Sequence, residues 1–514
     1  MLKKVATLSL LFNFQFLCIQ CQTTFNTRID YYNSLNGSGS IALINDTCYI
    51  PCSILKPGSA NWWEVSMIKL DMNGIYQKGN TYGSNSHSYL SGGLNAVYFN
   101  NSILCSGTAG DSITFPFGSI QASYYQFGKT ILDSVKFNIL TDTTYYNSIS
   151  AMKKIDNTKM VMYGYTDSIC GYKPIIYIVD TMENVLLKKE YLSTCIARIP
   201  NRIDINNQKG FIMCGFEQTP GFTTGSVFAI KTDSLGNQLW AKYYGNINTN
   251  ISSVIATKTS GYMIATNEID STYLTSFYWS SMKLYRLDEN GDTIWTKKIG
   301  NKSVAFSPTS IKQLPNYDFI ISGVRTIPHY DIGGSLVSEQ LYGFLCRIDS
   351  SGNVKWFNDY RGSGLIDTSA QNYLYDVVQV NDGGFISVGF VSPTDTSSQD
   401  TWVIKVDSMG CFSPGCNSTV GVTEELNADI QITAYPNPFT NEINVTIDIL
   451  QNIDENTYVQ LIEPVTGRVI QQQLLSSNYS ALQFNTENLS SGMYLIGVKG
   501  TNINPTFIKL INIR

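Results

Sequence analysis

Three copies of an Asp-x-x-Gly-x-x-x-Trp motif constrain the fold of this chain more than any other feature. They begin at Asp233, Asp288 and Asp349. Weaker copies lie at residues 71–74, 180–184 and 407–410. An Asp side chain can accept hydrogen bonds from the backbone of its own turn, and Gly readily adopts the positive φ that such turns need. We therefore expect each copy to be a structural turn between antiparallel strands, with its Trp packed between neighbouring units. A calcium loop is the alternative, but the alternating ligands and terminal Glu of an EF-hand are absent.

A second repeated element sets the number of units. It is a short apolar strand that ends in a small residue, most clearly at residues 384–389 and 210–215. The seven copies end at positions 52, 107, 164, 215, 266, 323 and 389. This period is slightly longer than that of known four-stranded propeller blades. Because radially repeated sheets leave only short edges, we predict an all-β chain with a seven-bladed β-propeller over residues 22–416. A parallel β-helix is the rival fold, but its repeats are much shorter.

Two further expectations follow from the repeat. The seventh unit stops at Gly410 without its Trp strand, and residues 25–32 have the pattern of that missing strand. We therefore expect residues 25–32 to pair into the blade that contains Trp402. Basic residues also recur two places before the Asp of each turn, on the same strand face, and we expect them to pair with that Asp. They are Lys69, Lys231, Arg286, Arg347 and Lys405.

Composition and the N-terminus indicate a secreted protein. Residues 1–21 begin with Lys3 and Lys4 and continue with a short apolar run, which is typical of a secretory signal peptide and too short for a membrane span. We expect no transmembrane segment in the mature chain. The net charge of the 514 residues is -5, and no basic face is apparent, so a nucleic-acid partner is disfavoured.

Nine cysteines follow the predicted signal peptide, which leaves at least one unpaired. Cys411 and Cys416 bracket a short turn and are the predicted disulfide. Cys48 and Cys52 lie four residues apart in one predicted strand, roughly 13 Å apart, so they cannot bridge each other. The cysteines inside other apolar strands are expected to be small buried hydrophobic residues; they are Cys105, Cys214 and Cys346. The two histidines are isolated, so no metal site is expected.

Aromatic residues outside the repeat mark a candidate binding rim. Two clusters occupy the same place in the first and fifth units, just before the strand that ends at the turn Asp. The candidates are Trp62, Trp63, Glu64, Phe277, Tyr278 and Trp279. Aromatic faces stack on sugar rings or peptide side chains, although covering blade edges is the simpler role for them. No catalytic constellation is visible, so we expect a non-enzymatic module that binds a glycan or a protein. The alternative is a glycosidase-like hydrolase with two carboxylates about 5 to 9.5 Å apart at the propeller axis.

The Asp-Gly-Trp repeat resembles two families of propeller enzymes. One is the tryptophan-docking repeat of quinoproteins, but those carry an extra residue before the Gly, and the adjacent-cysteine cofactor clamp is missing here. The other is the Asp-box of sialidases, which is one residue shorter in both intervals. Both resemblances concern fold rather than activity, and no cofactor is expected.

The last part of the chain is a separate domain. Residues 417–429 are polar and unpatterned, as in a linker. Residues 430–514 contain short strands with frequent turn signals, which predicts a small immunoglobulin-like β-sandwich; from composition alone it could serve as an adhesive or carbohydrate-binding module. The order of its motifs resembles the type A C-terminal sorting domain of the bacterial type IX secretion system. The residues that carry the resemblance are Pro436, Asn437, Pro438, Gly467, Gly492, Tyr494 and Lys509. The resemblance implies export through the outer-membrane translocon, with the passenger secreted or displayed on the cell surface.

Overall fold

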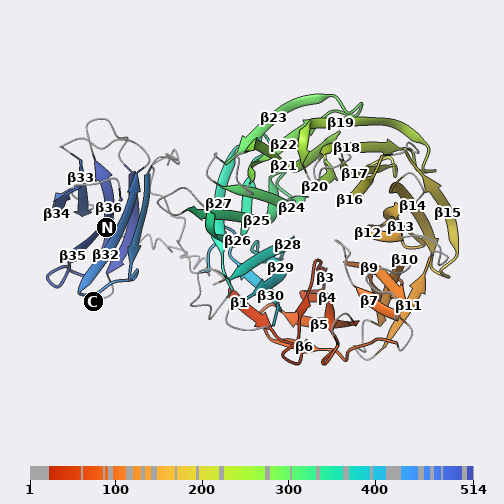
Figure 1. The fold of residues 1–514 in the computed structure, drawn as a ribbon, viewed down its shortest axis with the longest axis horizontal. Coiled ribbons are helices and arrows are strands. Elements are labelled where there is room, and N and C mark those ends of the chain that lie inside the picture. Colours follow the sequence, from red (N-terminus) through yellow and green to blue (C-terminus); the bar gives the residue numbers. More distant parts are fainter. Residues whose placement is uncertain are drawn as a thin grey trace, which may run out of the picture. The chain divides into compact units, whose positions relative to one another are not determined.

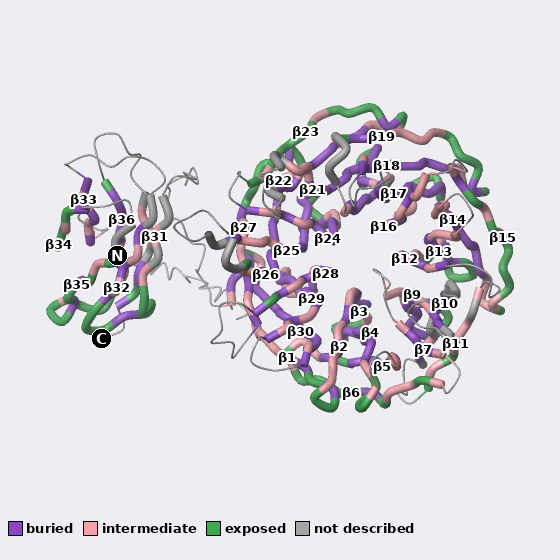
Figure 2. Tube along the Cα trace, viewed as in Figure 1, coloured by how far each residue is buried: buried purple, intermediate pink, exposed green. Residues whose placement is uncertain are grey.

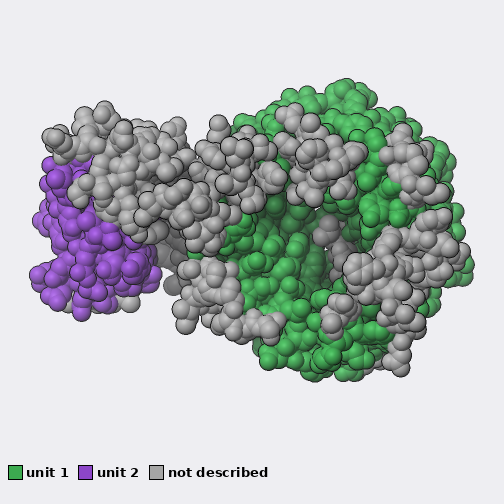
Figure 3. Space-filling view, in the orientation of Figure 1, with its two compact units in different colours: residues 1–417 green, residues 418–514 purple. Residues whose placement is uncertain are grey.

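The computed structural model divides into two compact units, Met1–Asn417 and Ser418–Arg514 (Figure 3). The predicted signal peptide and the predicted linker lie outside the described residues. The structure describes residues 22–512 except 60–61, 85–86, 91–95, 112–119, 129–133, 141–146, 168–170, 193–195, 219–224, 250, 273–277, 301–303, 331–335, 363–369, 394–397, 413–429, 450–456, 464–467, 476–478 and 500–505.

The first unit is a β-propeller-like ring of antiparallel sheets (Figure 1). Four of its sheets are separate, each named here in hydrogen-bonded order. The first is β2 (Asn36–Gly37), β4 (Thr47–Leu55), β5 (Trp63–Asp71) and β6 (Tyr76–Lys78), with β3 (Ala42–Ile44) also on β4. The second is β11 (Val135–Ile139), β10 (Ile120–Gly128), β9 (Ser102–Asp111) and β7 (His87–Leu90), with β8 (Ala96–Phe99) also on β9. The third is β12 (Asn147–Lys154), β13 (Lys159–Thr166), β14 (Lys173–Asp180) and β15 (Val185–Glu190). The fourth is β16 (Arg198–Ile205), β17 (Phe211–Gln218), β18 (Gly225–Thr232) and β19 (Gln238–Thr249).

The remaining strands form one 12-stranded sheet that contains three antiparallel groups. The first group is β20 (Ser252–Ala256), β21 (Tyr262–Thr272), β22 (Tyr278–Leu287) and β23 (Thr293–Ile299). The second is β24 (Ala305–Gln313), β25 (Phe319–Tyr330), β26 (Leu336–Ile348) and β27 (Val354–Tyr360). The third is β28 (Gln371–Gln379), β29 (Phe385–Ser392), β30 (Asp400–Val406) and β1 (Phe25–Ile29). Single parallel pairs, Ser280 with Ala305 and Leu341 with Gln371, join these groups.

We call each group of four or five antiparallel strands a blade. Counted outward from the centre of the ring, the strands of a blade are called first to fourth. First strands include β12, β16, β24 and β28, and fourth strands at the circumference include β15, β19, β23, β27 and β1 (Figure 1). Exposed residues gather on outer strands such as β15 and β23, whereas second strands such as β13 are mostly buried (Figure 2). Each apolar second strand is therefore covered on both faces by neighbouring blades, which explains its nearly continuous apolar sequence.

The Asp-x-x-Gly motifs form the predicted turns between third and fourth strands. Asp233 Oδ1 accepts hydrogen bonds from the N–H groups of Leu235 at 2.9 Å and Asn237 at 2.7 Å, and Gly236 has φ +74°. The same two bonds recur at Asp288, Asp349 and Asp407. Hydrogen bonds from Asn237 lower the pKa of Asp233. The Asp side chain is thus used within its own turn, as the structural interpretation predicted.

The apolar second strand ends in Gly because the neighbouring inner strand bulges at that point. The pairing register shifts at Leu374/Asp376 opposite Gly389, and at Pro200/Arg202 opposite Gly215. Equivalent shifts occur opposite Gly164 and Gly323. A Cβ atom on Gly389 would lie 1.8 Å from the carbonyl oxygen of Tyr373. Only a residue without a side chain leaves room for the bulged strand.

The Trp residues of the repeat join each blade to the next. A Cβ added to Gly291 would meet the Trp240 ring at 2.9 Å, so the indole covers the turn of the following blade. Trp240 Nε1 also donates to the carbonyl of Glu289 at 3.0 Å, and the Tyr244 hydroxyl donates to that of Gly291 at 2.7 Å. Trp295 covers Gly352 and Trp356 covers Gly410 in the same way. Packing of these Trp residues between blades is confirmed.

The expected pairing with the Asp of their own turn is wrong for the four basic residues whose contacts are described. One of them, Arg286, donates to carbonyls of its own blade, at 2.6 Å to Leu287 and 2.6 Å to Ser260. Lys231 binds Glu289 in the next blade, with Nζ 2.7 Å from Oε2 and 3.0 Å from the Glu289 carbonyl. Arg347 donates to the carbonyl of Ser408 at 3.2 Å, and Lys405 to that of Met72 at 3.3 Å. The turn Asp is already saturated by backbone N–H groups, whereas the carbonyls of the following turn still need donors.

The N-terminal strand completes the blade that contains Trp402, as predicted. In β1, Phe25 pairs with Lys405 and Arg28 with Trp402. Phe25 takes the place of the missing Trp: it pairs with the basic residue as Trp240 pairs with Lys231, and its ring would lie 2.9 Å from a Cβ on Gly74. Ile29 and Tyr31 share a buried core with Val388 and Val403 of the same blade and residues of the β4 blade.

The described cysteines agree with their predicted roles. Cys48, Cys52, Cys214 and Cys346 are free and buried, and Cys105 is buried as well. Burial raises the pKa of the Cys346 thiol to about 12. Cys411 is disulfide-bonded. Its predicted partner Cys416 lies outside the described residues, so that pairing stays a prediction.

The second unit contains two small sheets over one apolar core. The first is β31 (Ile430–Tyr435), β32 (Glu442–Ile449) and β35 (Tyr479–Asn485). The second is β34 (Arg468–Leu474), β33 (Tyr458–Glu463), β36 (Gly492–Lys499) and β37 (Thr506–Asn512). Both sheets contribute buried residues to the same cluster, including Val445 and Phe484 from one and Leu461 and Ile496 from the other. Two sheets that share one core are the arrangement of a small sandwich.

Candidate functional site

The centre of the ring is crossed by a buried arginine. Arg202 lies in β16 and is 3% exposed. Its Nε and Nη2 donate to the Thr309 carbonyl at 3.1 and 2.6 Å, and Nη2 also donates to the Tyr375 carbonyl at 3.1 Å. Thr309 and Tyr375 are the bulge residues of two other inner strands, β24 and β28. Burial lowers the pKa of Arg202 to about 10, so the guanidinium stays charged at neutral pH and links three blades.

Two aspartates lie beside this arginine on inner strands. Asp376 of β28 is 1% exposed and accepts hydrogen bonds from Ser310 Oγ at 3.0 Å and from the Ile41 N–H at 3.4 Å. Lys312 Nζ lies 2.6 Å from its Oδ1, and burial lowers the pKa of Lys312.

Asp204 of β16 is bound in the same manner. Lys153 Nζ lies 3.1 Å from its Oδ1, and the Ala256 N–H donates to its Oδ2 at 3.0 Å. The innermost strand of a blade has unpaired backbone groups along one edge, and an acceptor from the neighbouring blade can satisfy them. Both carboxylates therefore hold neighbouring inner strands together, and each is neutralised by a lysine. Within the described residues no group of three His, Cys, Asp or Glu side chains is placed to hold a metal ion.

Trp62, Trp63 and Glu64 lie at the end of the blades where second strands lead into third strands. We call this end the Trp62 rim. All three residues are half-buried. The Trp62 carbonyl accepts from the Lys56 N–H at 2.7 Å, the Trp63 N–H donates to Ser88 Oγ at 2.8 Å, and Glu64 lies 3.7 Å from Lys56 Nζ. Trp62 Nε1 is buried without a hydrogen-bond partner. The backbone thus holds two partly exposed indoles at the rim.

The second predicted aromatic cluster begins the equivalent strand of another blade. Tyr278 opens β22 as Trp63 opens β5. Phe277 and the side chains of Tyr278 and Trp279 lie outside the described residues. The two clusters therefore begin at the same position in their blades.

Partly buried ion pairs recur around the Trp62 rim. Arg198 lies 2.8 Å from Glu217 and Lys283 lies 2.9 Å from Glu268, and Arg325 pairs with Asp359. Burial raises the pKa of Asp359 to about 6, although the Arg325 charge opposes the shift. Its Oδ1 is buried without a hydrogen-bond partner.

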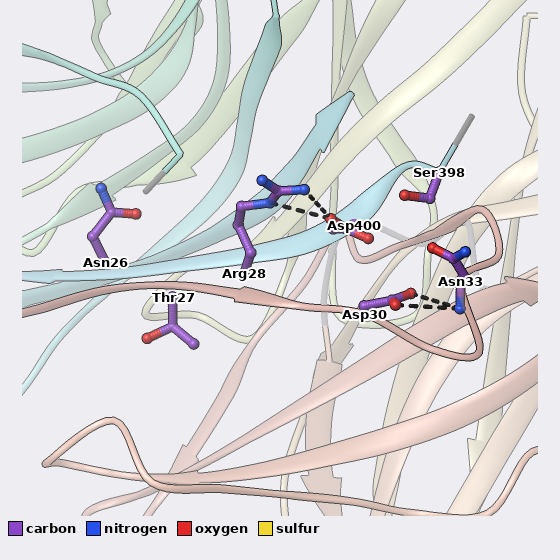
Figure 4. Close-up of a pocket in the computed structure, with 7 residues that line it drawn as sticks. All are labelled: Asn26, Thr27, Arg28, Asp30, Asn33, Ser398 and Asp400. Carbon is purple, nitrogen blue, oxygen red and sulfur yellow. Dashed lines mark hydrogen bonds and ion pairs between the residues drawn. The ribbon is translucent and has the colours of Figure 1, made fainter. Parts of the chain in front are cut away.

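A polar hollow opens beside a further ion pair, Arg28 with Asp400, where β1 meets β30 (Figure 4). Its volume is about 460 Å³. Arg28 Nε and Nη2 both donate to Asp400 Oδ2, at 3.1 and 2.5 Å, and Figure 4 shows the guanidinium directed at that carboxylate. The lining residues are Asn26, Thr27, Arg28, Asp30, Asn33, Ser398 and Asp400.

The sequence motifs did not single out these charged groups. Arg202 and Asp376 each follow the bulge of an inner strand, a place that sequence periodicity does not reveal. Arg28 lies in the segment that was expected to close the ring, so its strand was anticipated but its partner was not. Asp400 is separated from it by more than 370 positions, and only ring closure brings the two together.

The predicted residues of the second unit have different surroundings. Pro436, Asn437 and Pro438 are exposed, and Asn437 Oδ1 accepts from the Ile511 N–H at 2.9 Å. Tyr494 is 4% exposed, and its hydroxyl donates to the Ser490 carbonyl at 2.9 Å. Gly492 opens β36 at an exposed position. Gly467 and the side chain of Lys509 lie outside the described residues.

Comparisons with known proteins concern the two units separately. A search of curated proteins gave no match. The ring resembles, at low identity, a family GH93 α-L-arabinofuranosidase of Fusarium graminearum. With arabinobiose bound, that structure is 12% identical with a TM-score of 0.40 and covers 58% of this chain and 92% of its own. The structure of its complex with an iminosugar inhibitor is 11% identical with a TM-score of 0.42, and it covers 64% of this chain and 98% of its own. A mannose phosphorylase from Leishmania mexicana is 10% identical with a TM-score of 0.28, and the match covers 48% of this chain and 80% of the phosphorylase.

No helix among the described residues is long and apolar enough to cross a membrane.

The second unit has a family match. Residues 433–513 match the family described as the secretion system C-terminal sorting domain, and this range contains β32–β37 and the second half of β31. These residues therefore belong to the C-terminal sorting domains of the type IX secretion system, and the chain is a protein secreted across the outer membrane to the cell surface or the medium.

Proposed function

We propose that the ring is a non-enzymatic binding module that recognises an extracellular glycan or protein through the Trp62 rim. The observation that carries this proposal is that the two carboxylates on the inner strands are already paired. Asp204 and Asp376 are each neutralised by a lysine and accept a backbone N–H from the neighbouring blade. Charges used in this way serve to hold blades together. The rim instead offers two partly exposed indoles that are fixed by backbone hydrogen bonds, and aromatic anchors of this kind dominate many binding surfaces.

We test this proposal with the mature chain, residues 22–514, on arrays of glycans and extracellular proteins. The double variant Trp62→Ala/Trp63→Ala is expected to weaken binding of the identified ligand at least about tenfold, because it removes two aromatic anchors. Leu235→Ala is the matched control, since Leu235 is 70% exposed in an Asp-x-x-Gly turn at the opposite end of its blade. Unchanged binding by the double variant would overturn the assignment to this rim. Absence of any ligand on both arrays would overturn the binding function.

A hydrolase is the second candidate function. The observation that favours it is the presence of two carboxylates, Asp204 and Asp376, on inner strands of one ring. A glycosidase needs one carboxyl group as acid and another as base or nucleophile. Hydrolysis of chromogenic glycosides by the mature chain, lost in both Asp204→Asn and Asp376→Asn while the fold is retained, would replace the binding proposal with this one.

We further infer that the ring has seven blades. The support comes from the described strands: four separate sheets, and a 12-stranded sheet that single parallel pairs divide into three antiparallel groups. An immunoglobulin-like connection of the second unit remains a prediction, which its two sheets over one core favour.

The translocon is the proposed partner of the second unit. The exposed Pro436–Pro438 segment is a better candidate for direct contact than Tyr494, because the tyrosine is buried and bonded within its own domain. Crosslinking from position 437 in a type IX host, compared with position 460 on β33, tests this assignment. Equal crosslinking to the translocon from both positions would contradict it.

A further inference from the structure

The hollow between β1 and β30 contains an incompletely satisfied buried carboxylate. Asp400 is 3% exposed, and both donated bonds from Arg28 reach its Oδ2. Its Oδ1 is buried and has no hydrogen-bond partner among the described residues. Buried carboxylate oxygens normally accept hydrogen bonds, because an unpaired one loses its hydration without compensation. This oxygen therefore needs a donor that the described protein groups do not provide.

The surrounding groups are held in place before any ligand arrives. Asn26 Oδ1 accepts from Trp402 Nε1 at 2.8 Å, and its Nδ2 donates to the Arg361 carbonyl at 2.7 Å. Asp30 accepts the Asn33 N–H at 3.0 and 3.2 Å, as Figure 4 shows. A site whose polar groups are already oriented loses little entropy when it binds.

The charges in the hollow restrict the ligand class. Arg28 and Asp400 neutralise each other, and Asp30 adds a further carboxylate. An anionic ligand would face both carboxylates, and a cationic one would compete with the bound guanidinium. A neutral ligand with several hydroxyl groups fits best, since each hydroxyl can donate to a carboxylate and accept from an arginine. The volume of about 460 Å³ lies within the usual range of small-ligand sites, about 300–1,000 Å³.

We infer that this hollow binds a neutral saccharide, with one hydroxyl donating to the Asp400 carboxylate and a neighbouring hydroxyl accepting from the Arg28 guanidinium. This inference rests on the proposed binding function and adds the ligand class and a second contact region on the ring. Because the hollow lies where the N-terminal strand β1 pairs with β30, a bound saccharide contacts both ends of the chain segment that forms the ring. Ligand that binds only the folded state stabilises it, so binding should also raise the melting temperature.

The test is calorimetric titration of the mature chain with methyl glycosides of glucose, galactose, mannose and xylose, and with the disaccharides of these sugars. At least one probe is expected to bind and to raise the melting temperature. Asp400→Asn should weaken its Kd at least about tenfold and abolish the thermal shift, because it replaces the buried acceptor. Asp292→Asn is the matched control: Asp292 lies 2.5 Å from Lys242, the same separation as in the Arg28–Asp400 pair, but in a turn at the other end of its blade.

Asp30→Asn serves as a second variant, since Asp30 is exposed and its replacement leaves the Arg28–Asp400 pair intact. Asp30→Asn should also weaken saccharide binding. It decides the test if Asp400→Asn does not fold. Full saccharide binding by a folded Asp400→Asn variant, or by Asp30→Asn where the first does not fold, would overturn the inference. If binding is then lost only in Trp62→Ala/Trp63→Ala, the proposed function stands and the hollow is not its site. If no neutral saccharide binds the wild type, the inference fails, while a protein ligand on the array would still support the proposed function.

Discussion

At the scale of single residues, glycines and charged groups stabilise this ring in different ways. Gly389 and its counterparts leave space for a bulged inner strand, whereas the turn glycines provide a positive φ. Arg202, Asp204 and Asp376 use their charges to join inner strands of different blades. A substitution at these positions should therefore change stability through one identifiable contact.

Gly389→Ala is expected to destabilise the ring by about 2 to 4 kcal/mol, because its Cβ would overlap a backbone carbonyl that cannot move without displacing the bulge. A Cβ there would lie 1.8 Å from that oxygen. Gly58→Ala is the control. Its φ is +79° but no atom lies within 4 Å of the added Cβ, so it should cost only about 1 kcal/mol. Urea denaturation midpoints of both variants measure the difference, and equal losses would refute the steric explanation.

Asp359 should make stability depend on pH in a recognisable way. Burial raises its pKa from 3.8 to about 6 in the folded state, so the folded protein holds the proton more tightly than the unfolded chain does. This contribution is full below about pH 4 and is lost as the pH rises through 6, a change of at most about 3 kcal/mol. Asp359→Asn has no such proton to lose. The stability of the wild type minus that of the variant should therefore fall between pH 4 and 7 in urea titrations, and a constant difference would contradict the assigned shift.

At the scale of elements, each blade is tied to the next by its fourth strand. The ring rests on repeated contacts in which a Trp or Phe covers the next turn and a basic residue donates to a carbonyl of that turn. β1 provides this contact for the last blade, although it comes from the opposite end of the chain. The closing strand is thus one more copy of the general contact between blades.

Removal of residues 22–30 should open the ring and cost about 3 to 5 kcal/mol, because it exposes apolar surface on both neighbouring blades. Ile29 is fully buried in the core that joins them. The truncated chain should regain its urea midpoint when a peptide of residues 22–30 is added, since the peptide can pair with β30. A truncated chain as stable as the mature one would show that β1 does not hold the ring closed.

At the scale of the whole molecule, the chain combines two units with separate apolar cores. The first unit ends at Asn417 and the second begins at Ser418, and none of the repeated turns lies beyond Gly410. Separate cores generally fold independently. The export signal and the proposed binding surface can therefore be tested one at a time.

Truncation at Asn417 should leave a cooperatively folding ring that accumulates in the periplasm. Residues 417–514 fused to an unrelated carrier with a signal peptide should send that carrier across the outer membrane. Fractionation of a type IX host that expresses each protein gives the answer. Surface delivery of the truncated ring would contradict a sorting role for the second unit and would favour a role in adhesion.

Local pattern was sufficient for those parts of the fold that depend on neighbours in the chain. The Asp-x-x-Gly turns, the apolar second strands and the closing strand at residues 25–29 were predictable, because strand period and turn chemistry act over a few residues. The order of motifs after residue 430 likewise predicted the sorting domain, which the match over residues 433–513 confirms.

Contacts between distant residues depended on the tertiary structure. The basic residues were expected to bind the Asp two places ahead, but the turn saturates that Asp and the next blade supplies other acceptors. Arg202 reaches carbonyls more than 100 positions away, and Arg28 meets Asp400 only when the ring closes. The sequence by itself determined the strands, the turns and the export address, since these follow from local periodicity and motif order. Only the tertiary structure decided which charges meet, because that depends on how the blades are placed around the ring.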